Sequence, residues 1–249
     1  MSNYHMEICI DSIESAKRAI AGGATRLEVC SALSEGGLTP SPGLCKFIKS
    51  HSKILVYAMI RIRHGNFVYT KDEVDAMLYD LLILRNIGVD GFVFGALNSD
   101  YTIDVNCCRE IISAAKPLPV TFHRAFDEVK DPFQALQQII DLGFVRILTS
   151  GQRNTALEGL NLISELIKLA NDKIIIMPGS GITPENIEMI KKMSGAKEFH
   201  ASAKVPVHTV RREILNEQNE IKMGSSERAN LMMIASEDLI KQMINIINE

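Results

Sequence analysis

The cysteines of this 249-residue chain fall into two groups, and only one group is placed to do chemistry. Cys9 and Cys30 each end a short apolar run, whereas Cys45, Cys107 and Cys108 lie in stretches with a helical pattern. If the two runs are neighbouring parallel strands, their thiols approach each other, because adjacent strands are about 4.8 Å apart. Two facing thiolates suit a soft ion such as Cu(I). The residues leave open that both cysteines are simply small core side chains.

Charged and imidazole side chains form a second set at or just beyond the ends of predicted strands. Paired arginines hold a carboxylate or phosphate by two-point contacts, and a histidine or glutamate moves a proton. We therefore predict these catalytic residues: Glu28, Arg61, Arg63, His123, Arg124 and His200. Asp127 and Ser202 lie in similar positions. The alternative is a rim of salt bridges in which arginines cap carboxylates.

Two glycine-bearing turns, TSGQ from Thr149 and MPGSGI from Met177, follow later strands. The second turn runs into a helix that Thr183 and Pro184 are expected to begin. Backbone N–H groups in such turns, and a helix N-terminus, attract phosphate. The turns predict that Ser150, Gly151, Gly179 and Gly181 bind a phosphate-bearing ligand or cofactor. The residues leave open that these are ordinary turns without a ligand.

A recurring phrase indicates which elements position these residues. Gly23, Gly88, Gly143 and Gly195 each stand where a helix is expected to end, followed by a strand-forming run. Four further strand candidates lie between these junctions. Strands are predicted at 6–10, 25–30, 54–61, 91–95, 118–123, 144–149, 173–177 and 197–201. Eight strands alternating with eight helices predict an α/β fold, a single (β/α)8 TIM barrel over residues 1–249.

Alternation along each strand predicts which side chains enter the barrel. The more apolar face packs against the helices, so Glu7, Cys9 and Glu28 point inward. Inward charges must be paired or solvated. Four of them lie near strand starts, where two positive and two negative groups offset one another in a structural role: Glu7, Arg26, Arg146 and Glu198.

The segment 205–236 interrupts the pattern before a last helix that Ser236 is expected to cap. It is polar and has no clean period, so it is predicted to be an irregular excursion. An irregular stretch of this length in a compact domain is usually functional or disordered. A lid over the barrel, a partner-binding arm and a mobile excursion all fit this pattern.

Composition excludes several classes of protein. The chain has 27 basic and 30 acidic residues, a net charge of −3, so no strong field favours nucleic acid or an anionic membrane. No apolar run reaches the roughly 18 residues of a membrane span, and the opening MSNYH lacks the basic start and apolar run expected of a signal peptide. Five cysteines without a CxxC pair fit a reducing compartment. The expectation is a cytoplasmic protein.

Several strings occur in order across roughly residues 6–203: CIDSIESA, RLEVC with SEGGLTPS, MIRIRHGNF, GFVFGAL, TFHRAFD, RILTSG, IMPGSGI and EFHASA. Together they resemble the CutC family of copper homeostasis proteins. The resemblance implies a cytosolic TIM barrel that handles Cu(I) and forms a homo-oligomer. It also implies that Cys9 and Cys30 are copper ligands, since they match positions proposed for copper in some members.

The chain departs from the family pattern at two places. An arginine-rich string keeps Arg61 and Arg63 but lacks the family's proline and one glycine, and Ala201 replaces a cysteine of some members. The leading hypothesis is a Cu(I)-binding copper homeostasis protein. The alternative is a barrel enzyme acting on a small anionic or phosphorylated substrate. A third reading is a non-catalytic regulatory or scaffold protein.

Overall fold

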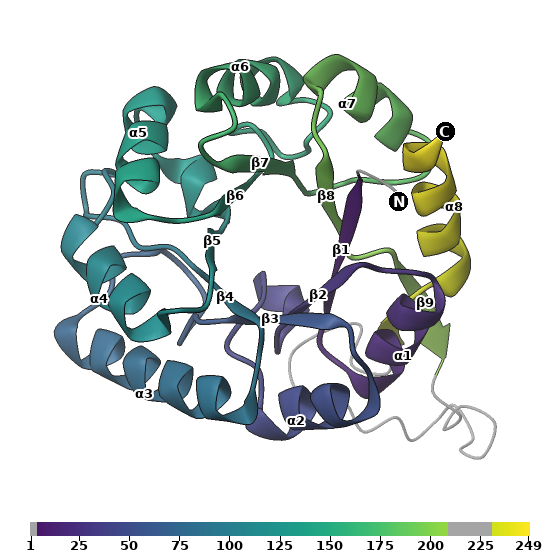
Figure 1. Cartoon of the computed structure of the whole chain (residues 1–249), viewed down its shortest axis with the longest axis horizontal. Helices are drawn as coiled ribbons and strands as arrows, with labels where there is room; N and C mark the ends of the chain where they lie inside the picture. The colour runs from purple at the N-terminus through teal and green to yellow at the C-terminus, as the bar shows by residue number, and fades with distance from the viewer. Residues whose placement is uncertain (1–3, 209–230) are drawn as a thin grey trace, which may run out of the picture.

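The computed structural model describes residues 4–208 and 231–249, and it is a (β/α)8 barrel (Figure 1). A ring of parallel strands lies inside and the helices surround it. The strands are β1 His5–Ile10, β2 Arg26–Val29, β3 Leu55–Met59, β4 Gly91–Phe94, β5 Val120–Phe122, β6 Arg146–Thr149, β7 Ile175–Pro178 and β8 Glu198–Ala201. The α/β fold class predicted from the sequence is confirmed.

The helices follow the strands in turn, and two short 3₁₀ helices lie in the connections. The α-helices are α1 Ile13–Ala21, α2 Pro42–His51, α3 Lys71–Ile87, α4 Val105–Ala115, α5 Pro132–Leu142, α6 Leu160–Ala170, α7 Ile187–Ser194 and α8 Glu237–Asn248. The 3₁₀ helices are η1 Leu33–Glu35 and η2 Arg124–Glu128. Among the described residues, no helix is both long and apolar enough to cross a membrane.

The strands follow one another round the barrel from β1 to β7, and β8 returns to pair with β1. β7 and β8 meet through a single bridge between Gly179 and His200, which completes the ring. Within β1, Glu7 faces Arg26 on one side and His200 on the other, and Cys9 faces Glu28. These pairings bring residues from the two ends of the chain together.

Local sequence signals explain most helix boundaries. Thr70 and Glu73 form a reciprocal capping box at the start of α3. Gly88, Gly143 and Gly195 adopt left-handed conformations immediately after helices, as the recurring phrase predicts. The prediction for α7 was wrong by several residues, because the helix begins at Ile187 after Asn186 rather than at Pro184.

The core lies between the strands and the helices. Met6, Ile8 and Ile10 of β1 are at most 1% exposed and belong to this core. The alternate residues Glu7 and Cys9 occupy the barrel interior. The predicted strand facing is therefore confirmed for β1.

The segment 205–236 is less irregular at its ends than the sequence indicates. β9 Lys204–His208 pairs antiparallel with β10 Leu231–Ala235, and the Ala235 backbone N–H donates to Ser15 Oγ of α1 at 3.2 Å. The excursion predicted for this segment is thus corrected where the structure describes it. Its remainder, 209–230, lies outside the described residues, so the lid and arm hypotheses stay predictions.

Candidate functional site at the mouth of the barrel

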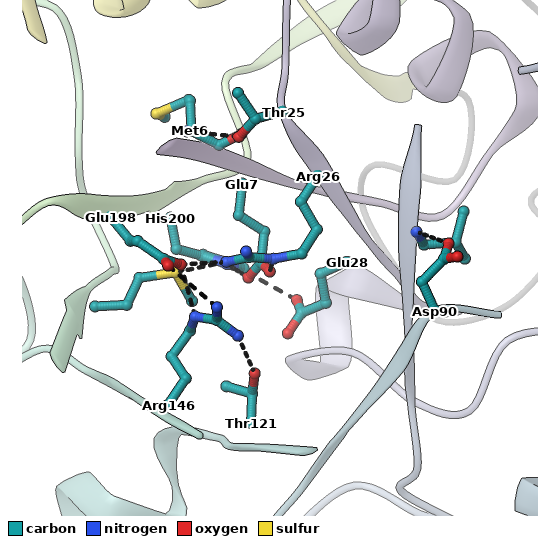
Figure 2. Close-up of polar contacts among 12 residues, drawn as sticks. Met6, Glu7, Thr25, Arg26, Glu28, Asp90, Thr121, Arg146, Glu198 and His200 are labelled. Atoms are coloured by element: carbon teal, nitrogen blue, oxygen red, sulfur yellow. Dashed lines mark hydrogen bonds and ion pairs between the residues drawn. The ribbon is translucent and has the colours of Figure 1, made fainter. Parts of the chain in front are cut away.

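A layer of paired charges lies inside the barrel, near the strand starts (Figure 2). Arg26 forms ion pairs with Glu7 and with Glu198, the latter at 2.7 Å between Nη2 and Oε2. Arg146 Nε lies 2.6 Å from Glu198 Oε2, and its Nη1 donates to Thr121 Oγ1 at 3.1 Å. The compensation predicted for these four charges is present, and each of the four is at most 6% exposed.

Glu7 also connects this charge layer to the mouth of the barrel. Its Oε1 lies 2.8 Å from His200 Nδ1, and Figure 2 shows the two side chains side by side. Burial opposes ionisation of Glu7, but the Arg26 and His200 charges hold its pKa well below the usual range. An ionised Glu7 therefore fixes the orientation of the His200 ring and leaves Nε2 directed elsewhere.

Cys9, Glu28 and His200 gather where the first, second and eighth strands end. One ligand atom from each residue, the Cys9 thiol sulfur among them, lies within 4.8 Å of the other two. His200 Nε2 is 3.7 Å from Glu28 Oε2. The register explains the grouping, since Cys9 faces Glu28 and not Cys30 across the β1–β2 pair.

Burial and neighbouring charges both shift the pKa values of Glu28 and His200 in this group. Burial raises the pKa of Glu28 to about 7, and no described residue forms a hydrogen bond with its Oε1. Burial alone would lower the pKa of His200, but Glu28, Cys9 and Glu7 raise it well above the ordinary value. The group thus contains a thiol, a carboxyl with an unused oxygen and an imidazole.

Cys30 lies behind this group. Its Sγ is 3.6 Å from Glu28 Oε2, and it packs in a buried cluster with Tyr57, Met59 and Val93. Burial, followed by the neighbouring Glu28, raises the pKa of the Cys30 thiol well above its usual range. Unlike Cys9, Cys30 does not line the cavity at the barrel mouth.

The group borders a large cavity of about 1210 Å³ at the C-terminal ends of the strands. Four of the predicted site residues from four different strand ends line it, as does Arg124: Glu28, Arg61, His123 and His200. Gly181 lines the same space, next to α7. This is the face on which TIM barrels build their sites.

The two arginines of the predicted anion clamp do not face this cavity together. Arg61 lines it, but its guanidinium donates to three backbone carbonyls, those of Glu35, Gly37 and Gly65, at 2.9–3.2 Å. Arg63 lies away from the cavity, where its Nε donates to Glu73 Oε1 at 2.5 Å. The paired contact expected of the two arginines is therefore corrected, because Arg61 lines the cavity and Arg63 does not. Both arginines instead order the loops that precede α2 and α3.

His123, which follows β5, is held as a neutral imidazole. Its Nδ1 accepts the Ala125 backbone N–H at 3.2 Å, which assigns the ring proton to Nε2. Burial and the nearby Arg61 charge lower its pKa to about 3. Nε2 has no hydrogen-bond partner among the residues that the structure describes. His123 therefore presents an unused N–H donor at neutral pH.

The turn after β6 already binds an anion, which is the side chain of Asp127. The Ser150 and Gln152 backbone N–H groups donate to Asp127 Oδ1 at 3.0 and 3.1 Å. Ser150 Oγ also bonds to Asp127, and Arg124 bridges Asp127 and Ser150 at 2.8 Å. Ser150 and Arg124 are thus engaged within the protein.

The glycines of the predicted phosphate site have a packing role. Both the Gly151 and Gly179 N–H groups donate to Thr149, to its hydroxyl and its carbonyl respectively, at 2.9 Å. A Cβ on Gly151 would lie 2.2 Å from Gly159 O, and one on Gly179 would lie 2.4 Å from Leu148 Cδ1. Close packing accounts for these two glycines without a ligand, and of the four residues predicted to bind phosphate only Gly181 lines the cavity.

Sequence reasoning missed two contributors to the site. Glu7 was assigned only to the charge layer, although it lies two residues before Cys9 on the same strand face. Phe67 lies in the cavity wall, with its ring centroid 4.8 Å from that of His123. Strand alternation pointed toward the first, whereas no sequence signal marks a loop phenylalanine.

The fold and the barrel mouth define a class: a (β/α)8 barrel with a thiol, a carboxyl and an imidazole gathered beside one large cavity. The CutC family model matches residues 4–205. The chain therefore belongs to the CutC family, as the resemblance of its motifs predicts.

Individual relatives agree with this assignment. The human protein described as copper homeostasis protein cutC homolog is 50% identical over 203 residues, which cover 82% of this chain and 74% of that protein. A CutC family protein of Parabacteroides distasonis is 50% identical over 222 residues, or 89% of this chain and 90% of that one. The crystal structure of a CutC protein from Streptococcus agalactiae has a TM-score of 0.77 at 34% identity, covering 80% and 98% of the two chains.

Proposed function

We propose that this protein binds copper as Cu(I) at the barrel mouth, through Cys9, Glu28 and His200, and acts in copper homeostasis in the cytoplasm. The observation that carries the proposal is the approach of one ligand atom from each residue to within 4.8 Å of the others. Thiol and imidazole ligands suit Cu(I), and the carboxylate adds a harder donor that also suits zinc. The names of the relatives favour copper over zinc.

Two further features support a metal site. Glu28 Oε1 is a buried polar atom without a partner in the described part of the chain, and a bound cation would satisfy it. Glu7 accepts a hydrogen bond from His200 Nδ1, the usual arrangement behind a metal-binding histidine. Cys9, Glu28 and His200 therefore supply the proposed ligands, and Glu7 orients His200 behind them.

Cys30 has a smaller part in this proposal than in the sequence-based hypothesis. It lies outside the group of three ligand atoms and does not line the cavity. We expect Cu(I) to meet Cys9 first, with Cys30 acting only through its contact with Glu28.

The test is a competition titration with a chromogenic Cu(I) chelator under reducing, anaerobic conditions. Cys9→Ser is expected to weaken binding at least about 100-fold, because losing a ligand exceeds the roughly 10–100-fold cost of losing an outer partner. Cys30→Ser, the matched control, is expected to bind within about threefold of the parent. Equal losses in both variants would restore the two-thiol site, and parental binding in Cys9→Ser would refute the proposed ligand set. Preferential binding of Zn²⁺ would assign the site to another metal.

The cavity volume of about 1210 Å³ favours a second candidate, an enzyme with a small-molecule substrate, since one ion needs far less space. Support for an anionic or phosphorylated substrate is weaker, because Arg61 and Arg124 already donate to groups of the protein. Assembly as a homo-oligomer, which the family resemblance implies, is tested by light scattering after gel filtration.

A further inference from the structure

Among the described residues that line the cavity, His123 offers the clearest unused hydrogen-bond donor for a ligand. It lies at the end of β5, across the barrel from β1 in Figure 1. The residue is 3% exposed, Nδ1 accepts the Ala125 N–H, and Nε2 has no partner within residues 4–208 and 231–249. Leaving a buried donor unpaired costs about 1–3 kcal/mol, so such groups normally have a purpose.

The surroundings of His123 combine this donor with apolar surface. Phe67 packs against the imidazole, and the Arg61 guanidinium carbon lies 5.0 Å from the centre of the Phe67 ring. Met59 and Leu148 also line the cavity. Small-molecule sites usually have this composition, a mostly apolar wall with a few polar groups that fix orientation.

The charges around the cavity disfavour an anion. Among the described residues, six carboxyl side chains line it, against four lysine and arginine side chains. Of those four, Arg61 donates through both terminal nitrogens to backbone carbonyls, which leaves only its buried Nε without a partner among the described residues, and Arg124 is held by Asp127 and Ser150. The other two, Arg153 and Lys204, share the lining with Glu158 and Glu185. These charges therefore disfavour an anion, and the free His123 Nε2–H donor calls for an uncharged oxygen acceptor rather than a cationic group.

We propose that the cavity binds a neutral organic compound with carbonyl or hydroxyl groups, of the kind a simple sugar presents, with one of its oxygens accepting the His123 Nε2–H bond. The apolar wall packs against the carbon face of the compound. A neutral imidazole suits this contact, because its single N–H donates to a carbonyl or hydroxyl oxygen without requiring a counter-charge. The site does not depend on copper, since His123 belongs to a different strand end from the proposed metal ligands.

The test uses the full chain, freed of metal by a chelator, and ligand-observed NMR. The probes are dihydroxyacetone, D-glyceraldehyde, D-xylose and D-glucose, and the charged arm contains inorganic phosphate and glyceraldehyde 3-phosphate. At least one neutral probe is expected to bind. In His123→Phe, which keeps an aromatic ring and removes the donor, its affinity is expected to fall about tenfold, the loss of one buried hydrogen bond.

Two controls accompany this experiment. His123→Gln returns an N–H near the original Nε2 position and is expected to restore most of the affinity. Cu(I) binding by His123→Phe is expected to remain at the parental level, which separates this inference from the metal site. No binding by any neutral probe, binding by phosphorylated probes alone, or equal affinity in parent and His123→Phe would each overturn it.

Discussion

Glu7 has two structural roles, and both follow from its position on β1. It is a partner of Arg26 in the charge layer, and it orients His200 through a 2.8 Å contact. Glu7→Gln keeps the size of the side chain and removes the charge. We expect Cu(I) affinity to fall about 10–100-fold, the usual effect of a partner behind a ligand. We also expect unfolding free energy to fall by about 3–5 kcal/mol, the usual cost of breaking a buried ion pair.

Glu198→Gln is the matched control for Glu7. It breaks ion pairs with Arg26 and Arg146 in the same layer but has no contact with His200 in the described structure. Denaturant unfolding should show a comparable loss of stability, whereas the chelator titration should show parental Cu(I) affinity. If both variants lose affinity equally, Glu7 acts only by stabilising the fold.

His123 gives the protein a specific sensitivity to acid. Its pKa is about 3 in the folded protein and near 6.5 in the unfolded chain, so only the unfolded state takes up a proton between these values. The stability that results is fully present above pH 6.5 and declines by about 1.4 kcal/mol per pH unit below it. Other groups add their own dependence, so the comparison needs a variant.

His123→Phe lacks the titrating ring. Between pH 7 and pH 4 the parent should therefore lose more of its measured unfolding free energy than the variant, so the difference between the two proteins should shift in favour of the variant as the pH falls. A constant difference between the two proteins across this range would show that His123 has an ordinary pKa.

Strand alternation made part of the site predictable. Polar and apolar side chains alternate along β1, so the inward direction of Glu7 and Cys9 followed from the sequence. The partner across the sheet did not, because register depends on how the barrel closes. The pairing of Cys9 with Glu28 rather than Cys30 is of this kind. The partners of Arg63 could not be predicted either, because a long side chain can reach several nearby acceptors.

At the scale of elements, the loops after β5 and β6 form one unit around Asp127. This carboxylate accepts bonds from both Ser150 and Gln152, and Thr149 joins the turn to β7 by accepting the Gly179 N–H. The sequence pointed to the glycines of these turns but did not show why glycine is needed there. A turn rich in N–H groups attracts an anion, and the anion here comes from the protein itself.

Substitutions at Gly151 and Gly143 distinguish the stability cost of overpacking from that of a left-handed backbone. Both have positive φ, 68° and 90°, but a Cβ would meet Gly159 O at 2.2 Å in the first and nothing within 4 Å in the second. Gly143→Ala is expected to cost about 1–2 kcal/mol for the left-handed backbone. Gly151→Ala should cost about 1–3 kcal/mol more from overpacking. Equal losses in chemical denaturation would mean that the β6 turn relaxes freely.

The helix-ending glycines also explain why the fold itself was predictable. Each junction is a local signal, and eight alternating units permit few topologies other than a closed barrel. The start of α7 was placed three residues early: Thr183 O accepts the Asn186 and Ile187 N–H groups at 3.2 and 3.0 Å, so a turn begins at Thr183, but the regular helix begins only at Ile187. Local rules thus gave the order of elements but not the residue at which the regular helix begins.

For the whole molecule, closure of the barrel joins the two ends of the chain. β8 pairs with β1, and α8 packs against the end of α1, where an added Cβ on Gly22 would lie 2.8 Å from Ile240 Cβ. Ile240, Met243 and Ile247 of α8 are at most 1% exposed. The strand that α1 follows carries both Glu7 and Cys9, so the last helix supports the proposed metal site from outside.

Ile240→Ala tests whether the chain is one cooperative unit. Loss of this buried side chain is expected to lower the unfolding free energy by about 2–5 kcal/mol. If 1–249 is a single domain, far-UV circular dichroism and loss of Cu(I) binding will report the same shifted denaturation midpoint. Met193→Ala, at a side chain that is 57% exposed on α7, is the control and should change stability by less than about 0.5 kcal/mol. Copper binding that survives past the circular dichroism transition would instead show that the β1–β2–β8 sector folds independently of α8.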